Sequence, residues 1–424
     1  MTRWLFKGGR VLDPASGRDA VADLAVADGV IADPASLRGP TEEVDAAGLW
    51  ILPGAIDMHV HLREPGNEEA ETVESGCRAA ARGGFTTLGV MPNTRPPMDS
   101  PGEVGALLAR GEAAGLARLI PCACLTRGRA GREAADLEAL ARAGARAFTD
   151  DGSTIPDEGL LREVMRRAAA LGLAVLDHAL DPAARGHLHE GAKSKALGLP
   201  GIPASAEIRI VERDIRLAAE TGCAVHIQHV SARESADLIR AARRSGLRVT
   251  GEATPHHLAL TDADIPDADT RFKMSPPLRT AKDRDALRLA LIEGAIGVLA
   301  TDHAPHAAAA KARPFAEAPN GVIGLETALA VTHGILVRDG GLSPLEWARR
   351  WTCGPAEVLG LPPPSLESGR PADVTLFDPA RRWTVRADCF ASRSRNTPFE
   401  GWVLTGLPVL TLRAGKAAFR AGRD

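Results

Sequence analysis

The sequence predicts an α/β protein: a (β/α)8 (TIM) barrel with a small β-sandwich domain built from both termini. Three observations lead to this prediction: eight short apolar runs, amphipathic segments between them, and turn-rich ends of a different texture. The length of 424 residues suits one large and one smaller domain, at about 100–200 residues per domain. We therefore expect a barrel over residues 53–361, with residues 1–52 and 362–424 together forming the sandwich.

The eight apolar runs are rich in Val, Ile and Leu and are continuous rather than alternating, as in buried parallel strands. They cover residues 51–62, 85–92, 118–126, 145–152, 173–180, 223–231, 247–255 and 296–305. Helix-like segments lie between them, and several end in Gly, which often follows a helix C-terminus. Eight such units favour a closed barrel. A doubly wound open sheet is the alternative that this pattern leaves open.

Composition excludes several classes of protein. The chain has 51 Lys and Arg against 54 Asp and Glu, so no strong positive field points to nucleic acid or an anionic membrane as the main partner. No apolar run is long enough to span a membrane, and the first residues do not resemble a signal peptide. Six Cys do not form a disulfide framework, so we expect a cytoplasmic protein.

Metal-capable side chains stand at the ends of five predicted strands. His59 and His61 are two residues apart on the first strand, so both point to one face and can converge on one ion. The other four ends carry Asp150-Asp151, His178, His229 and Asp302. Active sites of (β/α)8 barrels lie at the carboxyl ends of the strands. Imidazole and carboxylate ligands suit Zn²⁺, although other divalent ions are open, and the set could hold two ions.

Five motifs of this chain resemble the longer, class I bacterial type of dihydroorotase, a family of the amidohydrolase superfamily. They are DMHVHLREPG (57–66), GLPGIPASAE (198–207), TPHHL (254–258), ATDHAPH (300–306) and NTPFEG (396–401). The resemblance covers nearly the whole chain. It implies the zinc-dependent, reversible cyclisation of N-carbamoyl-L-aspartate to L-dihydroorotate in de novo pyrimidine (UMP) biosynthesis.

The resemblance also implies a ligand set for one or two zinc ions per subunit. His59, His61 and Asp302 would bind the first ion, His178 and His229 the second, and Asp151 would bridge the two. Some relatives use a carboxylated lysine as the bridge, but residues 145–152 contain no Lys, so a carboxylate bridge is consistent. Strand alternation sends the neighbouring Asp150 the opposite way. Asp302 would in addition move the proton between the water and the amide nitrogen.

Substrate contacts follow from the same resemblance. Arg63 would clamp the substrate carboxylate, a role suited to a bidentate guanidinium. The other contacts would come from His61, Asn93, Ser275, His306, Asn320 and Gly321. Ser275 stands where the family usually has Asn, so it contributes a shorter contact. A homodimer is expected, and the family also suggests a complex with aspartate carbamoyltransferase.

Two other functions compete with this interpretation. Another cyclic amidase, such as a hydantoinase or an allantoinase, shares the barrel and the His-x-His pair, but the missing lysine on the fourth strand and the surroundings of Arg63 argue against it. A non-catalytic homologue serving as a partner of aspartate carbamoyltransferase would have lost metal ligands, whereas all six are present here.

Overall fold

Eight parallel strands form the central barrel in the computed structural model, which describes residues 2–422. They are β6 (Ala55–Val60), β7 (Phe85–Val90), β8 (Arg118–Ala123), β9 (Ala147–Phe148), β10 (Ala174–Asp177), β13 (Val225–Ile227), β14 (Val249–Ala253) and β15 (Val298–Leu299). Neighbouring strands pair in this chain order, and a bridge between Val60 and His303 joins the last strand region to the first. The barrel, rather than the open sheet, is therefore confirmed.

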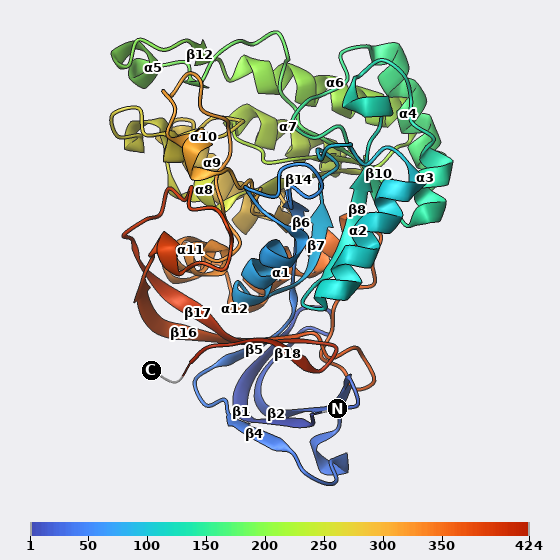
Figure 1. Cartoon of the computed structure of the whole chain (residues 1–424), viewed down its shortest axis with the longest axis vertical. Coiled ribbons are helices and arrows are strands. Elements are labelled where there is room, and N and C mark those ends of the chain that lie inside the picture. The colour runs from blue at the N-terminus through green and yellow to red at the C-terminus, as the bar shows by residue number, and fades with distance from the viewer. Residues whose placement is uncertain (1, 423–424) are drawn as a thin grey trace.

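Helices surround the barrel (Figure 1). The longer ones are α1 (Val73–Arg82), α2 (Pro101–Ala114), α3 (Leu137–Ala143), α4 (Glu158–Ala170), α6 (Ser205–Thr221), α7 (Arg233–Arg244), α9 (Ala281–Ile292) and α12 (Pro344–Trp351). Sequence signals set their ends: Thr72 and Thr280 form capping boxes, and Gly144 and Gly222 close helices in the left-handed conformation. Shorter helices are α5 (Ala192–Ala196), α8 (Pro255–Ala259), α10 (Ala308–Lys311), α11 (Ala328–Thr332) and α13 (Cys353–Val358).

Strands from both termini form a separate sheet below the barrel (Figure 1). They are β1 (Trp4–Asp13), β2 (Arg18–Ala27), β3 (Val30–Ala32), β4 (Glu42–Asp45), β5 (Trp50–Pro53), β16 (Val374–Thr384), β17 (Val403–Arg413) and β18 (Lys416–Arg420). The sheet curls over its own apolar core. The edge strand β18 therefore reaches β1 and β4, where Arg420 pairs with Glu42 and lies over the Trp4 ring. A sandwich-like unit made from both ends of the chain results.

One predicted strand, residues 51–62, proves to be two. β5 belongs to the terminal sheet, where it pairs with β1 and β16, whereas β6 opens the barrel. Gly54 separates them, and a Cβ there would lie only 2.2 Å from the Thr86 hydroxyl, so the chain passes too close for a side chain. The predicted domain limits at 52/53 and 361/362 stay predictions.

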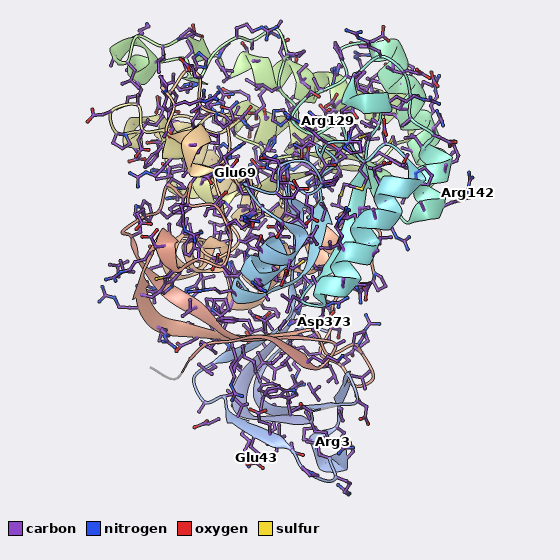
Figure 2. The ribbon with its side chains drawn as sticks, viewed as in Figure 1. Arg3, Glu43, Glu69, Arg129, Arg142 and Asp373 are labelled. Atoms are coloured by element: carbon purple, nitrogen blue, oxygen red, sulfur yellow. The ribbon has the colours of Figure 1, made fainter. Side chains whose placement is uncertain are left out.

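The barrel strands run away from the terminal sheet. Figure 1 shows β6 and β7 with their arrowheads directed away from it, so the carboxyl ends of the strands lie at the far side of the barrel. Arg3 and Glu43 mark the terminal sheet in Figure 2, whereas Arg129, which follows β8, lies over the opposite end. Within residues 2–422, no helix combines the length and apolar character needed to cross a bilayer.

Candidate active site

All six predicted metal ligands gather at the carboxyl ends of the barrel strands. His59 lies in β6, and His61 follows its end directly. The other four lie one to three residues beyond a strand end. They are Asp151 after β9, His178 after β10, His229 after β13 and Asp302 after β15. All six side chains are buried. Five strands thus deliver their ligand-capable groups to one place, as the sequence analysis predicted.

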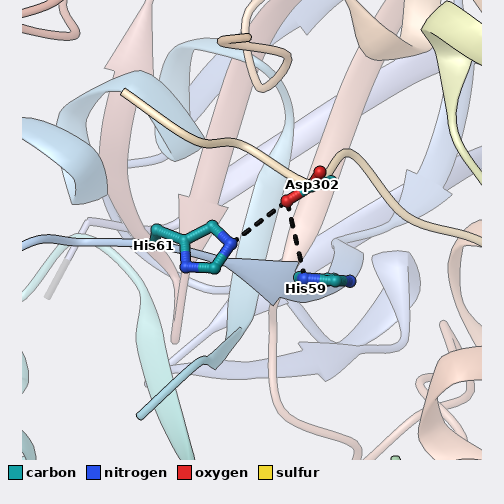
Figure 3. A group of neighbouring side chains, drawn as sticks. All are labelled: His59, His61 and Asp302. Carbon is teal, nitrogen blue, oxygen red and sulfur yellow. Dashed lines mark hydrogen bonds and ion pairs between the residues drawn. The ribbon is translucent and has the colours of Figure 1, made fainter. Parts of the chain in front are cut away.

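Two overlapping groups within this cluster have the geometry of ion sites. The first consists of His59, His61 and Asp302 and the second of His59, Asp151 and His229; in each, the ligand atoms lie within 4.8 Å of one another. Asp302 Oδ1 lies 3.1 Å from His61 Nε2 and 3.5 Å from His59 Nε2 (Figure 3). His178 stands beside the second group, with its Nδ1 3.8 Å from Asp151 Oδ1.

Unsatisfied buried atoms indicate that the cluster is built for cations. His59 Nε2 and Asp151 Oδ1 are buried 3.2 Å apart, yet neither has a hydrogen-bond partner among the residues that the structure describes. Buried polar atoms are nearly always satisfied, so two such orphans facing each other point to an absent bonding partner. A divalent ion bound by neutral imidazoles and carboxylates fits this donor set.

Burial sets the protonation of the two histidines on β10 and β13. It lowers the pKa of His178, and it lowers that of His229 well below the usual value with the help of the positive charges of His178 and His59. Burial alone would raise the pKa of Asp151, but His59 and the other imidazoles outweigh it and hold that pKa well below its usual range. Burial therefore favours the neutral, metal-binding forms of His178 and His229, and Asp151 is held ionised. At His59, by contrast, burial is outweighed by the charges of Glu252, Asp151 and Asp302, which raise the pKa well above its usual value.

Three residues of the site have strained backbone conformations. Arg63, His229 and Asp302 have φ angles of +62°, +31° and +48°, in the region that side chains other than Gly rarely adopt. Each lies just beyond a strand end, where the chain turns sharply. Strained residues of this kind cluster at functional sites, where the surrounding structure holds them in place.

Asp150 and its neighbour point in opposite directions. Asp150 accepts hydrogen bonds from the backbone N–H groups of Leu125 and Thr126 and from the Thr126 hydroxyl, so it holds the loop after β8. Asp151 faces the histidines instead. The alternation expected from the sequence thus places Asp151, and not Asp150, in the cluster.

A cavity of about 210 Å³ opens on the cluster. Every predicted substrate contact lines it: His61, Arg63, Asn93, Ser275, His306, Asn320 and Gly321. Of the predicted metal ligands, Asp151, His178, His229 and Asp302 also line the cavity, whereas His59 lies beneath it. The structure thus brings all the sequence-predicted site residues together.

Arg63 lines this cavity and forms no ion pair with any other residue of the described range 2–422. Its Nε donates to the backbone carbonyl of Pro305 at 3.0 Å, which leaves the terminal nitrogens of the guanidinium available. The nearby carboxylates are engaged elsewhere, since Glu64 pairs with Arg110 and Glu68 accepts from the Gly66 N–H. Burial lowers the pKa of Arg63 to about 10, so the side chain still carries its charge near neutral pH.

The remaining pocket residues are held by one another. Asn93 Oδ1 accepts from His61 Nδ1 at 2.8 Å, and its Nδ2 lies 3.3 Å from Asp151 Oδ2. His306 Nε2 donates to the Asn320 carbonyl at 2.7 Å, and burial together with the Arg63 charge lowers the pKa of His306 to about 3. The Ser275 hydroxyl lies 3.4 Å from His178 Nε2.

Glu252 is a site residue that the sequence analysis missed. It is fully buried in β14, and its Oε1 accepts from His59 Nδ1 at 2.6 Å and from the His229 N–H at 3.1 Å. Its Oε2 accepts from His226 Nε2 at 3.1 Å, and the Thr250 hydroxyl in turn donates to His226 Nδ1. Glu252 thereby holds the proton of His59 on Nδ1 and leaves Nε2 free to bind a cation.

Glu252→Gln should therefore weaken metal binding by about 10–100-fold, the usual cost of losing a carboxylate that orients a metal-binding histidine. Competition of the apoprotein with a zinc chelator would measure this. Glu326→Gln is the matched control, since Glu326 is also a buried carboxylate but accepts from Ala391 and Ser392, away from the cluster. Metal affinity within about threefold of the unmodified protein in Glu252→Gln would contradict the role.

Solved structures with the same architecture define the class of protein. The L-hydantoinase (dihydropyrimidinase) from Arthrobacter aurescens superimposes with a TM-score of 0.87 at 26% identity, covering 100% of this chain and 97% of that one. The D-hydantoinase from Bacillus sp. AR9 gives a TM-score of 0.82 at 26% identity, covering 98% and 95%. The fold is that of the amidohydrolase barrels.

Sequence relatives narrow the class to one family. Residues 48–235 match the family model described as dihydro-orotase-like. The dihydroorotase of Pelotomaculum thermopropionicum is 46% identical over 420 residues, 98% of each chain, and that of Bacillus subtilis (strain 168) is 42% identical over 424 residues, 99% of each. The chain belongs to the dihydroorotase family.

Proposed function

We propose that this protein is a dihydroorotase, which interconverts N-carbamoyl-L-aspartate and L-dihydroorotate by closing and opening a cyclic amide. The observation that supports this most directly is the guanidinium of Arg63, which forms no ion pair within residues 2–422 and lies in the same cavity as the histidine–carboxylate cluster. A substrate that carries a carboxylate beside an amide carbonyl fills both parts of such a cavity. Dihydroorotases over 40% identical to this chain along nearly its full length support the same reaction.

Asp302 is the group that we assign to proton transfer. During ring opening, water adds to the amide carbonyl carbon, the C–N bond breaks, and the nitrogen gains a proton. A carboxylate oxygen of Asp302, facing the cavity, accepts the proton of the attacking water and returns it to the leaving nitrogen. Ring closure runs through the same steps in reverse. Arg63 and Asn93 hold the substrate carboxylate meanwhile, and the short proton path depends on that orientation.

Zinc is the cofactor that we propose, bound by the six residues assigned from the sequence. His59, His61 and Asp302 would hold one ion, His178 and His229 a second, and Asp151 would lie between them. Such an ion would supply Lewis-acid polarisation of the amide carbonyl and make a bound water acidic enough to ionise near neutral pH. Metal analysis of the purified protein tests both the identity of the metal and its stoichiometry.

Reconstitution of the metal site should not require carbon dioxide. A carboxylated lysine needs it, but residues 145–152 contain no Lys, and Asp151, whose Oδ1 lies 3.2 Å from His59 Nε2, is the bridge that we propose instead. Apoprotein given Zn²⁺ in bicarbonate-free buffer should recover the same activity as apoprotein given Zn²⁺ and bicarbonate. A strict requirement for carbon dioxide would show that the proposed bridge is wrong.

The decisive experiment compares two substrates. A spectrophotometric assay should detect turnover of dihydroorotate, dependent on added Zn²⁺, and little turnover of hydantoin. The opposite preference would favour a hydantoinase, the second candidate, which the structural similarity to the Arthrobacter aurescens enzyme suggests. A protein that binds no metal and turns over neither substrate would be the non-catalytic homologue. We also propose that the protein forms a homodimer and a complex with aspartate carbamoyltransferase. Light scattering of the protein alone tests the homodimer, and light scattering of the mixed proteins tests the complex.

A further inference from the structure

Two buried lysines, Lys273 and Lys311, hold the loop that ends at Asn320 and Gly321. Lys311 is the last residue of α10, and its Nζ donates to the backbone carbonyls of Lys273, Pro319 and Gly321 at 3.3, 3.1 and 3.0 Å. The Nζ of Lys273 donates to the carbonyls of Phe315, Ala316 and Ala318, a few residues earlier in the same loop. Each ammonium therefore occupies a cage of three carbonyl oxygens.

Burying these two ammonium groups costs free energy of folding. Within residues 2–422, neither lysine forms an ion pair, and α10 offers only alanines before Lys311. Burial lowers the pKa of Lys311 to about 7, the charge of Lys273 adds to this effect, and Asp269 opposes it. A buried cation without a carboxylate partner is destabilising unless its donors are fully used. The carbonyl cage meets that condition.

The cage of Lys311 differs from that of Lys273 because it includes the peptide of Gly321. Gly321 is fixed through both of its peptide groups: its N–H donates to the Lys273 carbonyl at 2.9 Å, and its carbonyl accepts from Lys311 Nζ and from Asn396 Nδ2, both at 3.0 Å. Gly321 has a φ of +136°, and a Cβ there would lie 2.8 Å from the Ala304 carbonyl and 2.9 Å from His306 Nε2. The backbone therefore lines the cavity where no side chain fits.

We propose that Lys311 is a positioning residue: by holding the carbonyls of Pro319 and Gly321 on either side of Asn320, it sets the Asn320 carbonyl, which lines the cavity and accepts from His306, at the height where it meets the substrate ring amide. The proposal rests on the substrate contacts proposed above. Lys273 holds only the earlier part of the loop, so its ammonium group serves the fold rather than the substrate. The two lysines thus form a matched pair, alike in burial and in number of acceptors but different in the peptide that they hold.

Lys311→Met should raise KM for dihydroorotate about tenfold and change kcat by less than about threefold, because the lost contact is made in both the bound substrate and the transition state. The two Met variants should lower the thermal midpoint by similar amounts. Lys273→Met, however, should change KM by less than about twofold. Lys311→Arg keeps the charge and the donors, so it should recover part of the affinity. Metal content should stay that of the unmodified protein in all three variants.

A folded Lys311→Met protein with unchanged KM, or equal increases in KM for the two Met variants, would overturn the proposal. If Lys311→Met does not fold, Lys311→Arg decides: a KM that stays unchanged although hydrogen exchange across residues 312–321 is faster than in the unmodified protein would also overturn the proposal. Arg63→Lys separates this proposal from the proposed substrate site. If Arg63→Lys shows its expected loss in kcat/KM while Lys311→Met leaves KM unchanged, the proposed substrate site stands and only the role of Lys311 is removed.

Discussion

Replacement of Asp302 by Asn should lower turnover at least about 100-fold, the low end for loss of a general acid–base group. Asn keeps the size of the side chain but cannot accept and return a proton. The substitution also suits the backbone, because residue 302 has a φ of +48° and Asn tolerates the left-handed region better than most residues. A loss of activity therefore reports on the carboxylate rather than on a distorted loop.

Metal content decides how the Asp302→Asn result is interpreted. Asp302 Oδ1 lies 3.1 Å from His61 Nε2, so the same carboxylate is also proposed as a ligand. Zinc should therefore be measured in the variant and supplied in excess during the assay. Turnover within tenfold of the unmodified protein, with metal retained, would contradict the assignment of proton transfer to Asp302.

The strand-end residues of the site could be predicted because their signal is local. His59 and His61 share a face through a spacing of two, and each of the other ligands closes an apolar run, so the barrel geometry alone brings them together. The strands are nevertheless shorter than the runs: β9 covers only Ala147–Phe148 of residues 145–152. The excess residues leave the strand ladder and form the turns that carry Asp151 and Asp302.

Glu252 and Lys311 could not be predicted in this way, because their partners are distant in sequence. The hydrogen bond from His59 to Glu252 joins residues 193 positions apart, and Lys311 Nζ reaches the Lys273 carbonyl 38 positions away. An acidic residue inside the apolar run 247–255 was the only local signal for Glu252. A buried charge in a strand predicts a partner, but the sequence does not identify which one.

Arg63 lies between these two cases. The sequence analysis places the first strand over residues 51–62, and continued alternation would bring Arg63 to the face of His59 and His61. The strand instead ends at Val60, and a turn with a φ of +62° at Arg63 directs the side chain into the cavity. The position was predicted correctly from the family resemblance, whereas its physical cause is the turn.

Conversion of Arg63 to Lys should cost about 2–4 kcal/mol in kcat/KM for dihydroorotate, as expected when a charge-assisted bidentate contact is left half made. Lys keeps the positive charge and faces the same backbone strain at φ +62°, so fold and net charge are matched. Its single ammonium nitrogen cannot, however, replace the Nε contact to the Pro305 carbonyl and also offer the two parallel donors that a guanidinium presents to a carboxylate. Ser275 reaches less far than an Asn would, which leaves more of the recognition to Arg63 and Asn93.

The choice of substrate shows whether Arg63 acts on the carboxylate. A neutral ring such as dihydrouracil, if the protein turns it over, should be nearly unaffected by Arg63→Lys, because it has no carboxylate to lose. Arg110→Lys is the neighbouring control, since it perturbs the partner of Glu64 outside the cavity and should change kcat/KM less than about twofold. Equal losses on dihydroorotate and dihydrouracil would mean that Arg63 supports the metal cluster or the loop around Pro305, and that the substrate carboxylate binds elsewhere in the cavity.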